Sequence, residues 1–412
     1  MRPLAFIFIV YFFCTTPAFS QSDEQRTVSP HTYEVLTAAR ELMDENQFTP
    51  AQHELEALLP KIESNDYETA LAYQSLAYIF LALEDYPKAR RALEQSLQNE
   101  ALLPLDVAQN LRYNLGQIYM RTESYRQGVK VLQQWLQKTE NPPAGAWHLV
   151  GWGYYKLNRP KEALTYLQKA VAQSPREDWW VLILSIYLEQ KSYAKAVPVL
   201  RELIQHFPQK RQYWLHLTDV YLMQHNYHQA LNTLQLTYTQ MGLEEKDLLR
   251  LAQLYLQREV PYSAARLLEN ELQAGTITRN AHNLELLGNS WLLAREPKKA
   301  LNSLAKAAVL KRDGTLFFRC GHIAVTTEQW REAAQWFKQA LSHSNFKNRG
   351  QAQLLLGIAY YQTGQHNQAL KTLGKAGQYA KIRAQAQSWM QRIKSKLQIS
   401  QQVSSQRSTS PG

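Results

Sequence analysis

The chain has 412 residues, enough for two or three ordinary domains or for one array of small units. Hydrophobic residues make up 45% and charged residues 20%, and Leu, Ala and Tyr dominate the apolar positions, which favours an all-α protein over one rich in strands. The formal net charge of +11 forms no concentrated basic block, so we expect only a weak attraction to anionic partners or membrane headgroups.

The first twenty residues have the pattern of a secretory signal peptide. Arg2 gives a basic start, residues 4–14 are apolar, and a small-x-small cleavage site ends at Ser20. We expect cleavage between Ser20 and Gln21, export of the mature chain, and no nucleic-acid partner. An uncleaved anchor is the alternative, which the apolar stretch disfavours because it is shorter than the roughly 20 residues needed to span a bilayer. No later segment is apolar enough to span.

Residues 21–31 are predicted to be a flexible N-terminus. Once the leader is removed, Cys320 is the only cysteine left, so no intramolecular disulfide can form. Cys320 falls at a packing position inside a predicted helix, where we expect a buried apolar residue and not a reactive thiol.

A repeat then runs along most of the chain. Three residue types recur in one register, spaced by 33 and then 34 residues. They are Trp147, Trp180 and Trp214; Tyr154, Tyr187 and Tyr221; and Ala163, Ala196 and Ala230. Shared spacing in three residue types indicates a repeated structural unit.

The pattern resembles the tetratricopeptide repeat, which has a large residue at position 4, Leu at 7, Gly or Ala at 8 and an aromatic at 11. Ala follows at 20, a large residue at 24, Ala at 27 and Pro at 32. The fullest match is Trp147, Val150, Gly151, Tyr154, Ala163, Leu167, Ala170 and Pro175. Extending the template gives ten units, whose residues at position 20 are Ala51, Ala89, Gly128, Ala163, Ala196, Ala230, Ala264, Ala300, Ala333 and Ala369.

The resemblance implies two antiparallel helices, A and B, in each unit. Small residues at positions 8 and 20 let the helices approach closely, and each unit must pack on the next to bury its apolar face. We therefore predict an all-α, right-handed solenoid of about ten units over residues 32–381. A capping helix should follow at 382–398, and 399–412 should be a disordered tail.

Motifs for catalysis and metal binding are missing from the sequence. There is no glycine-rich phosphate loop, no G-x-S-x-G and no C-x-x-C. His53 and Glu54 begin an H-E-x-x-H pattern, but Ala57 stands where the second His belongs. We expect no enzyme activity, no metal and no small-molecule cofactor, which leaves a protein-binding surface as the functional element.

In tetratricopeptide repeats the ligand usually lies along helix A, at positions 2, 5, 9, 12 and 13. In the third and fourth units, this rule selects aromatic, amide and cationic side chains, a composition typical of protein-binding hot spots. They are Asn110, Tyr113, Gln117 and Arg121, then His148, Trp152, Tyr155 and Lys156. The alternative is that neighbouring units cover them. Trp147 and Tyr154, at positions 4 and 11, are expected in the core.

Four stretches carry a narrower resemblance. They are QNLRYNLGQIY (109–119), YWLHLTDVYL (213–222), VPYSAARLLE (260–269) and NLELLGNSWLLARE (283–296). They resemble exported repeat proteins of Gram-negative bacteria that are accessory to TonB energy-transduction systems. The resemblance implies a periplasmic, non-catalytic scaffold for siderophore or haem uptake, with a membrane complex of the TonB, ExbB and ExbD type as partner. A scaffold for cell-envelope or exopolysaccharide assembly is the alternative.

Overall fold

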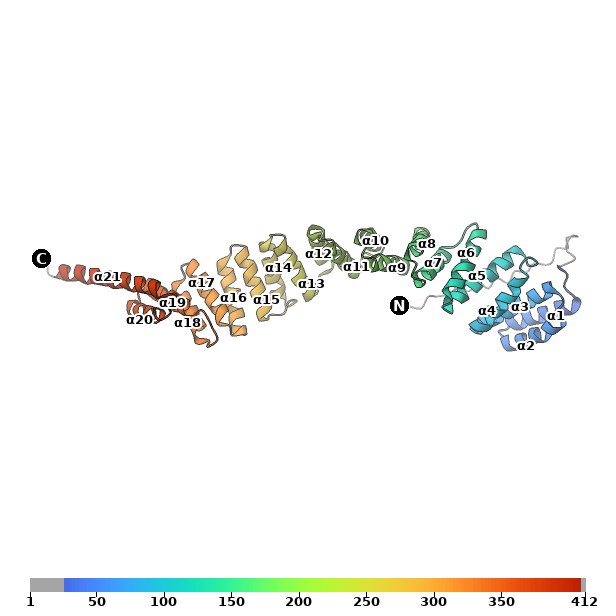
Figure 1. Ribbon diagram of the computed structural model, residues 1–412, viewed down its shortest axis with the longest axis horizontal. Helices are drawn as coiled ribbons and strands as arrows, with labels where there is room; N and C mark the ends of the chain where they lie inside the picture. Colours follow the sequence, from blue (N-terminus) through green and yellow to red (C-terminus); the bar gives the residue numbers. More distant parts are fainter. Residues whose placement is uncertain (1–25, 409–412) are drawn as a thin grey trace. The chain divides into compact units, whose positions relative to one another are not determined.

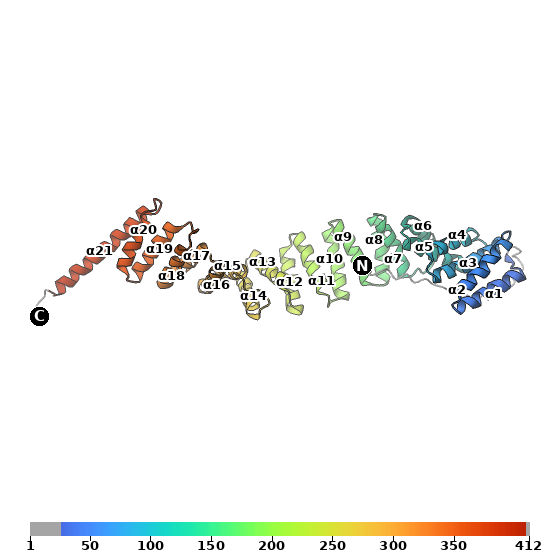
Figure 2. The same cartoon turned by 90° about the horizontal axis from the view of Figure 1, so that it is seen from below.

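The protein is described by a computed structural model that covers residues 26–408, with side chains described as far as residue 399. All elements in this range are helices, arranged as ten consecutive pairs and one last helix (Figures 1 and 2). The chain divides into two compact parts, each made of several repeats, which we call unit 1 (Met1–Pro208) and unit 2 (Gln209–Gly412). The predicted all-α fold of about ten repeats with a C-terminal helix is confirmed, while the predicted signal peptide lies outside the described residues.

Helices A and B alternate along each unit, and the helices of a pair lie side by side (Figure 1). Unit 1 contains α1 (Pro30–Asp44), α2 (Phe48–Leu58), the 3-10 helix η2 (Leu59–Lys61), α3 (Asp66–Ala82), α4 (Tyr86–Gln98), α5 (Leu105–Arg121), α6 (Tyr125–Lys138), α7 (Ala144–Lys156), α8 (Pro160–Gln173), α9 (Glu177–Glu189) and α10 (Tyr193–His206). Unit 2 contains α11 (Arg211–Met223), α12 (Tyr227–Met241), α13 (Glu245–Gln257), α14 (Pro261–Ala274), α15 (Ala281–Leu293), α16 (Pro297–Lys311), α17 (Gly314–Thr326), α18 (Trp330–Ser342), α19 (Arg349–Gln362), α20 (His366–Ala376) and α21 (Arg383–Ser408).

Small residues set the contact between helices A and B. The residue at position 20 is buried in all ten pairs, and the nine alanines there are 0% exposed. A Cβ atom on Gly151 would lie 2.7 Å from Cγ of Leu167, and one on Gly321 would lie 2.5 Å from the Phe337 ring. These distances are too short for real carbon atoms, so glycine allows the two helices to approach this closely.

The same tight turn joins the helices of every pair. In the turn that follows each helix A, a single residue adopts a left-handed backbone conformation. The amide of the next residue donates a hydrogen bond to the carbonyl five residues before it, with N···O distances of 2.7–2.9 Å. This is the Schellman arrangement, in which glycine is the preferred left-handed residue. Only the tenth pair uses glycine, at Gly364; φ is 53–60° at the other nine positions, Asn46, Glu84, Glu123, Asn158, Lys191, His225, Glu259, Arg295 and Glu328.

The N-terminal segment is more ordered than predicted. Helix α1 begins at Pro30, and the Ser29 hydroxyl accepts a hydrogen bond from the Thr32 amide at 3.3 Å. The Ser29 amide also donates to the Glu68 carboxylate, and Arg26 donates to the Ala101 carbonyl at 3.3 Å. The prediction of flexibility is therefore wrong for residues 26–31, because a Ser N-cap followed by Pro starts the helix. Residues 21–25 lie outside the described residues.

The C-terminal helix is longer than predicted. Helix α21 packs on α20 and α19 through Ala386 and Ile393, both 0% exposed. It continues to Ser408, so the prediction of a disordered tail is wrong for residues 399–408, while 409–412 lie outside the described residues. No Gly or Pro occurs within α21 to end the helix earlier.

Cys320 lies in the core of unit 2, beside Leu304 and Ile323, and is 0% exposed. Burial raises the pKa of its thiol to about 12, although the neighbouring Arg319 acts in the opposite direction. The thiol is therefore protonated at neutral pH and lacks the thiolate character that reactivity requires. This agrees with the prediction of a packing residue.

Two features are absent from the part of the chain that the structure describes. None of the helices in that part of the chain is both long enough and apolar enough to cross a membrane. Nor do three or more His, Cys, Asp or Glu side chains between residues 26 and 399 come together as a group that could hold a metal ion.

Candidate partner-binding surface

The predicted surface residues lie on two helices A of unit 1, and the structure buries two of them. Gln117 on α5 is 2% exposed and His148 on α7 is 6% exposed, so the prediction that they face a partner is wrong. The His148 ring is stacked on Trp179 of α9, with ring centroids 4.9 Å apart. The following repeat therefore covers a position that the family rule leaves open.

Three other predicted residues, all on α5, vary in exposure. Tyr113 is half-buried, and its ring lies 4.6 Å from that of Trp135, which stands where the repeat usually has Ala. Burial raises the pKa of Tyr113. Asn110 is half-buried as well, whereas Arg121 is exposed with its guanidinium 4.5 Å from the Tyr86 ring centroid. Tyr113 thus serves mainly in packing.

The remaining predicted residues, Trp152, Tyr155 and Lys156, lie together with Tyr125 and Glu189, which the sequence did not single out. We call these five residues the aromatic patch. The Tyr125 and Trp152 rings meet edge to face at 5.2 Å, and the Lys156 ammonium lies 5.5 Å from the Trp152 centroid. The Tyr155 hydroxyl donates to the Glu189 carboxylate at 2.9 Å. The three rings are half-buried and the two charged groups exposed, so the patch combines fixed rings with accessible charges.

The Tyr155–Glu189 bond joins helices A of adjacent repeats. It raises the pKa of Tyr155, with burial and the Glu189 charge adding to the effect. The phenol therefore stays protonated at neutral pH, and the ring is held in place by its own hydrogen bond. Ordering this ring on binding costs little conformational entropy.

The tryptophans at position 4 are not core residues. Trp147 is half-buried, with its ring 6.0 Å from that of Tyr166 and the Lys169 ammonium 4.5 Å from its centroid. Its equivalents Trp180 and Trp214 are also half-buried. The prediction of a buried Trp147 is therefore wrong, because its ring lies along helix B and one face stays open. Tyr154, at 6% exposure, is in the core as predicted.

His148 makes the stability of the fold depend on pH. Burial lowers its pKa to about 4 from the usual 6.5; the Asp178 charge opposes this shift and Arg176 adds to it. Between these two values the unfolded chain binds a proton that the folded chain does not. Stability should therefore fall as the pH falls through this window, by up to about 1.4 kcal/mol per pH unit.

We expect the His148→Phe variant, which keeps a ring against Trp179 but cannot ionise, to lose this dependence. Urea unfolding of both proteins at pH 7 and 4.5 measures it. From pH 7 to 4.5, the wild type should lose about 2 to 3 kcal/mol more than the variant. An equal loss in the two proteins would show that His148 is not the group responsible.

Contacts between adjacent repeats keep the spacing seen in the sequence. Hydrogen-bonded pairs 33 or 34 residues apart recur in both units, among them Tyr155 with Glu189, Arg211 with Glu244 and Tyr238 with Glu271. Two tetratricopeptide repeat models match the chain, one at residues 144–177 and the other at 75–146 and 320–384.

The matched parts of the chain are tetratricopeptide repeats. Such repeats generally mediate interactions between proteins. The matched ranges include α5 and α7, which carry the predicted surface residues. Among curated proteins, no sequence matches this one.

Several solved structures match this chain at low sequence identity. One, from Parabacteroides merdae, is 17% identical, with 59% of this chain and 93% of that chain covered and a TM-score of 0.35. YrrB, described as a repeat protein with an unusual peptide-binding site, is 20% identical, with 45% and 92% covered and a TM-score of 0.35. The APC/C hetero-tetramer Cut9–Hcn1 is 14% identical, with 90% and 91% covered and a TM-score of 0.26. Likeness at these levels says nothing of partners.

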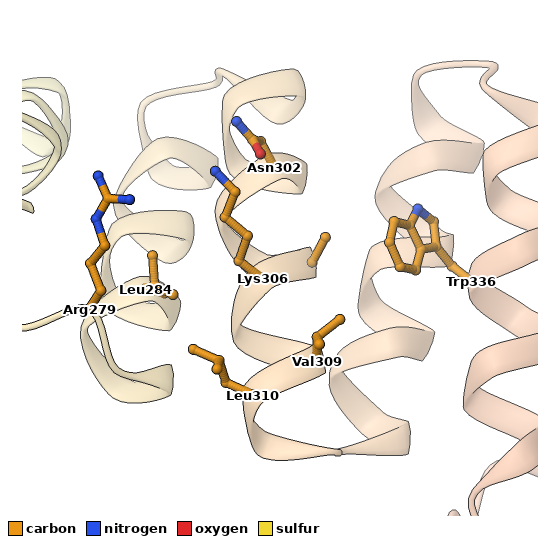
Figure 3. A pocket seen from close by; sticks show the side chains of 8 residues that line it. Arg279, Leu284, Asn302, Lys306, Val309, Leu310 and Trp336 are labelled. Atoms are coloured by element: carbon orange, nitrogen blue, oxygen red, sulfur yellow. The ribbon is translucent and has the colours of Figure 1, made fainter. Parts of the chain in front are cut away.

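A separate hollow of about 490 Å³ lies in unit 2, where side chains from α15, α16, α18 and the turn before α15 line it (Figure 3). Its lining residues are Arg279, Leu284, Asn302, Ala305, Lys306, Val309, Leu310 and Trp336. Val309 and Leu310 are 60% and 58% exposed, so the hollow has room for an apolar side chain. Sequence reasoning missed it because the family rule considers helix A, and most of this lining comes from helices B.

Proposed function

We propose that this protein is a non-catalytic scaffold that binds a protein partner on the aromatic patch of unit 1. The observation that carries the proposal is the state of Trp152 and Tyr155. Both rings are half-exposed at positions where the repeat requires no aromatic residue, and both are already held, by Tyr125 and by Glu189. Fixed, partly exposed aromatic rings are the side chains that contribute most to protein interfaces.

The charges around the rings suggest what the partner offers. Lys156 and Glu189 are both exposed, so the patch presents one cation and one anion beside an aromatic centre. A partner segment with an apolar or aromatic side chain, flanked by groups that pair with each charge, would complement this arrangement. The charges would favour one orientation of that segment, while the rings would supply most of the affinity.

The finer proposal concerns location and system. We propose that the mature chain works in the periplasm as an accessory part of a TonB-type system for siderophore or haem uptake. The leader pattern of residues 1–20 supports export, and the four stretches that resemble TonB-associated repeat proteins support the system. The absence of catalytic and metal-binding motifs from the sequence supports a scaffold over an enzyme.

Capture of the partner tests this proposal. The tagged full chain is expressed in its own host, membrane extracts are mildly crosslinked, and captured proteins are identified by mass spectrometry. We expect a TonB, ExbB or ExbD-type protein or an outer-membrane receptor. A bait with both Trp152→Ala and Tyr155→Ala should lose this partner, whereas Tyr33→Ala, which removes a 61% exposed aromatic outside the patch, should retain it.

Recovery of none of these proteins by the wild-type bait would overturn the TonB assignment. A deletion strain distinguishes the alternative system. Impaired growth under iron limitation supports the uptake role, whereas normal growth there combined with a capsule or envelope defect indicates a scaffold for envelope or exopolysaccharide assembly. The mass of the mature chain checks export, since cleavage should leave Gln21 as the first residue.

A further inference from the structure

The basic excess of the chain is not spread evenly, contrary to the expectation from its sequence. Residues 1–332 contain 35 Lys and Arg and 35 Asp and Glu, so they are formally neutral. Residues 333–412 contain 11 Lys and Arg and no Asp or Glu. The whole formal charge of +11 therefore belongs to the segment after Glu332.

This charge is accessible on α18 to α21 and the turns between them. Nine of the basic side chains there are exposed: Lys338, Lys347, Lys371, Lys375, Lys381, Arg383, Arg392, Lys394 and Lys396. Arg349 is different, since it is half-buried and donates to the carbonyls of Leu341 and His343, both at 2.9 Å.

Carboxylates that neutralise basic groups elsewhere are missing from this segment. Just before it, Lys311 and Arg319 both pair with Glu285, at 3.5 and 3.2 Å. Among the described residues, the eight exposed cations other than Lys396 form no ion pair with a carboxylate, and the Lys396 ammonium lies 5.2 Å from the Tyr361 ring centroid. The like charges of this segment repel one another. An anionic surface that approaches them therefore lowers the electrostatic free energy of the segment.

The residue types favour an extended anionic surface over a specific anionic site. Seven of the nine exposed cations are Lys, a compact point charge that pairs with anions without the fixed geometry of Arg. Exposed apolar groups accompany them, with Tyr379 at 40% and Ile399 at 61% exposure, and Trp389 half-buried on α21. Aromatic rings and Lys side chains beside an apolar helix face are characteristic of helices that lie at the membrane–water interface.

We propose that this basic segment, residues 338–396, docks the protein on the surface of a lipid bilayer rich in anionic headgroups. Each basic side chain near such a surface adds to the attraction, which acts only within about a Debye length, roughly 8 Å at physiological salt. Docking is peripheral and needs no spanning helix. It lies in unit 2 and does not depend on the aromatic patch of unit 1.

Vesicle co-sedimentation of the full mature chain tests the proposal. Vesicles of phosphatidylcholine alone are compared with vesicles of equal parts phosphatidylcholine and phosphatidylglycerol. We expect binding to the anionic vesicles only, and its loss as the salt concentration rises to about 1 M. In a variant carrying Lys371→Glu, Lys375→Glu and Lys394→Glu, the binding constant should fall at least about tenfold.

A control variant carrying Lys130→Glu, Lys138→Glu and Lys161→Glu makes the same change in net charge at exposed sites in unit 1. It should keep at least half of the wild-type binding, and circular dichroism should show both variants folded. Equal losses in the two variants, equal binding to both vesicles, or no binding to either would overturn the proposal. So would binding to soluble poly-glutamate but not to the anionic vesicles, which would indicate an acidic protein as partner.

Discussion

Replacing Trp291 by Ala is expected to lower the free energy of local unfolding of α15 and α16 by about 3–5 kcal/mol. Trp291 is the largest fully buried side chain, at 0% exposure. The Tyr262 ring meets it edge to face at 5.5 Å, and the Lys299 ammonium lies 4.4 Å from its centroid. Removing the indole would leave a cavity at the contact of α14, α15 and α16, whose helices cannot close over it fully.

Native-state hydrogen exchange of the α15 and α16 amides measures this loss locally, without assuming that all repeats unfold together. Trp147→Ala is the matched control and should cost less, because part of that side chain is already in water. Trp291→Phe should also cost less than Trp291→Ala, since Phe refills much of the space and removes an indole N–H for which the described residues offer no hydrogen-bond acceptor. Equal losses for Trp291→Ala and Trp147→Ala would contradict the packing described for unit 2.

Removing Trp152 and Tyr155 together is expected to weaken binding of the captured partner by a factor of about 30 to 1,000, corresponding to about 2 kcal/mol for each side chain that acts as a hot spot. The folded state should lose little, because both rings are partly exposed and their contacts are worth at most about 1 kcal/mol each: Trp152 meets the Tyr125 ring and the Lys156 ammonium, and Tyr155 bonds Glu189. The thermal midpoint should therefore remain close to that of the wild type.

Titrating the bait and measuring how much crosslinked partner is recovered gives the change in affinity, and circular dichroism gives the midpoint. Tyr33→Ala should leave both values unchanged. If the double variant binds its partner normally but unfolds at a much lower temperature, the two rings are packing residues and the patch is not the binding surface.

The sequence predicted the helix pairs well because the size of a residue indicates whether two helices meet there. Glycine or alanine at positions 8 and 20 is required wherever two helices approach closely, so each small residue marks a contact. Gly151 against Leu167 is one example, and the buried Ala163 is another. The boundaries at Ser29 and Ser408 were missed for a different reason, since they depend on capping and on the lack of helix breakers.

The surface was harder to predict because its exposure depends on neighbouring repeats. His148 and Trp152 both occupy positions that the family rule assigns to the ligand-binding face. Trp179 in the next repeat covers His148, whereas Trp152 meets the edge of Tyr125 and the Lys156 ammonium and stays partly exposed. A rule that considers one repeat at a time cannot distinguish these two cases. The clustering of the basic residues, in contrast, could be seen by counting charges along the sequence.

The turns between helices A and B also have a practical consequence. Nine of them place a residue other than glycine in the left-handed region, which costs about 1 kcal/mol each for a side chain such as Glu. Replacing Glu84, Glu259 and Glu328 by Gly should relieve this cost at three separate sites, with nearly additive gains. None of the three belongs to the aromatic patch or the basic segment. The protein can therefore be made more heat-resistant for biochemical work in graded steps, without altering either surface proposed to bind.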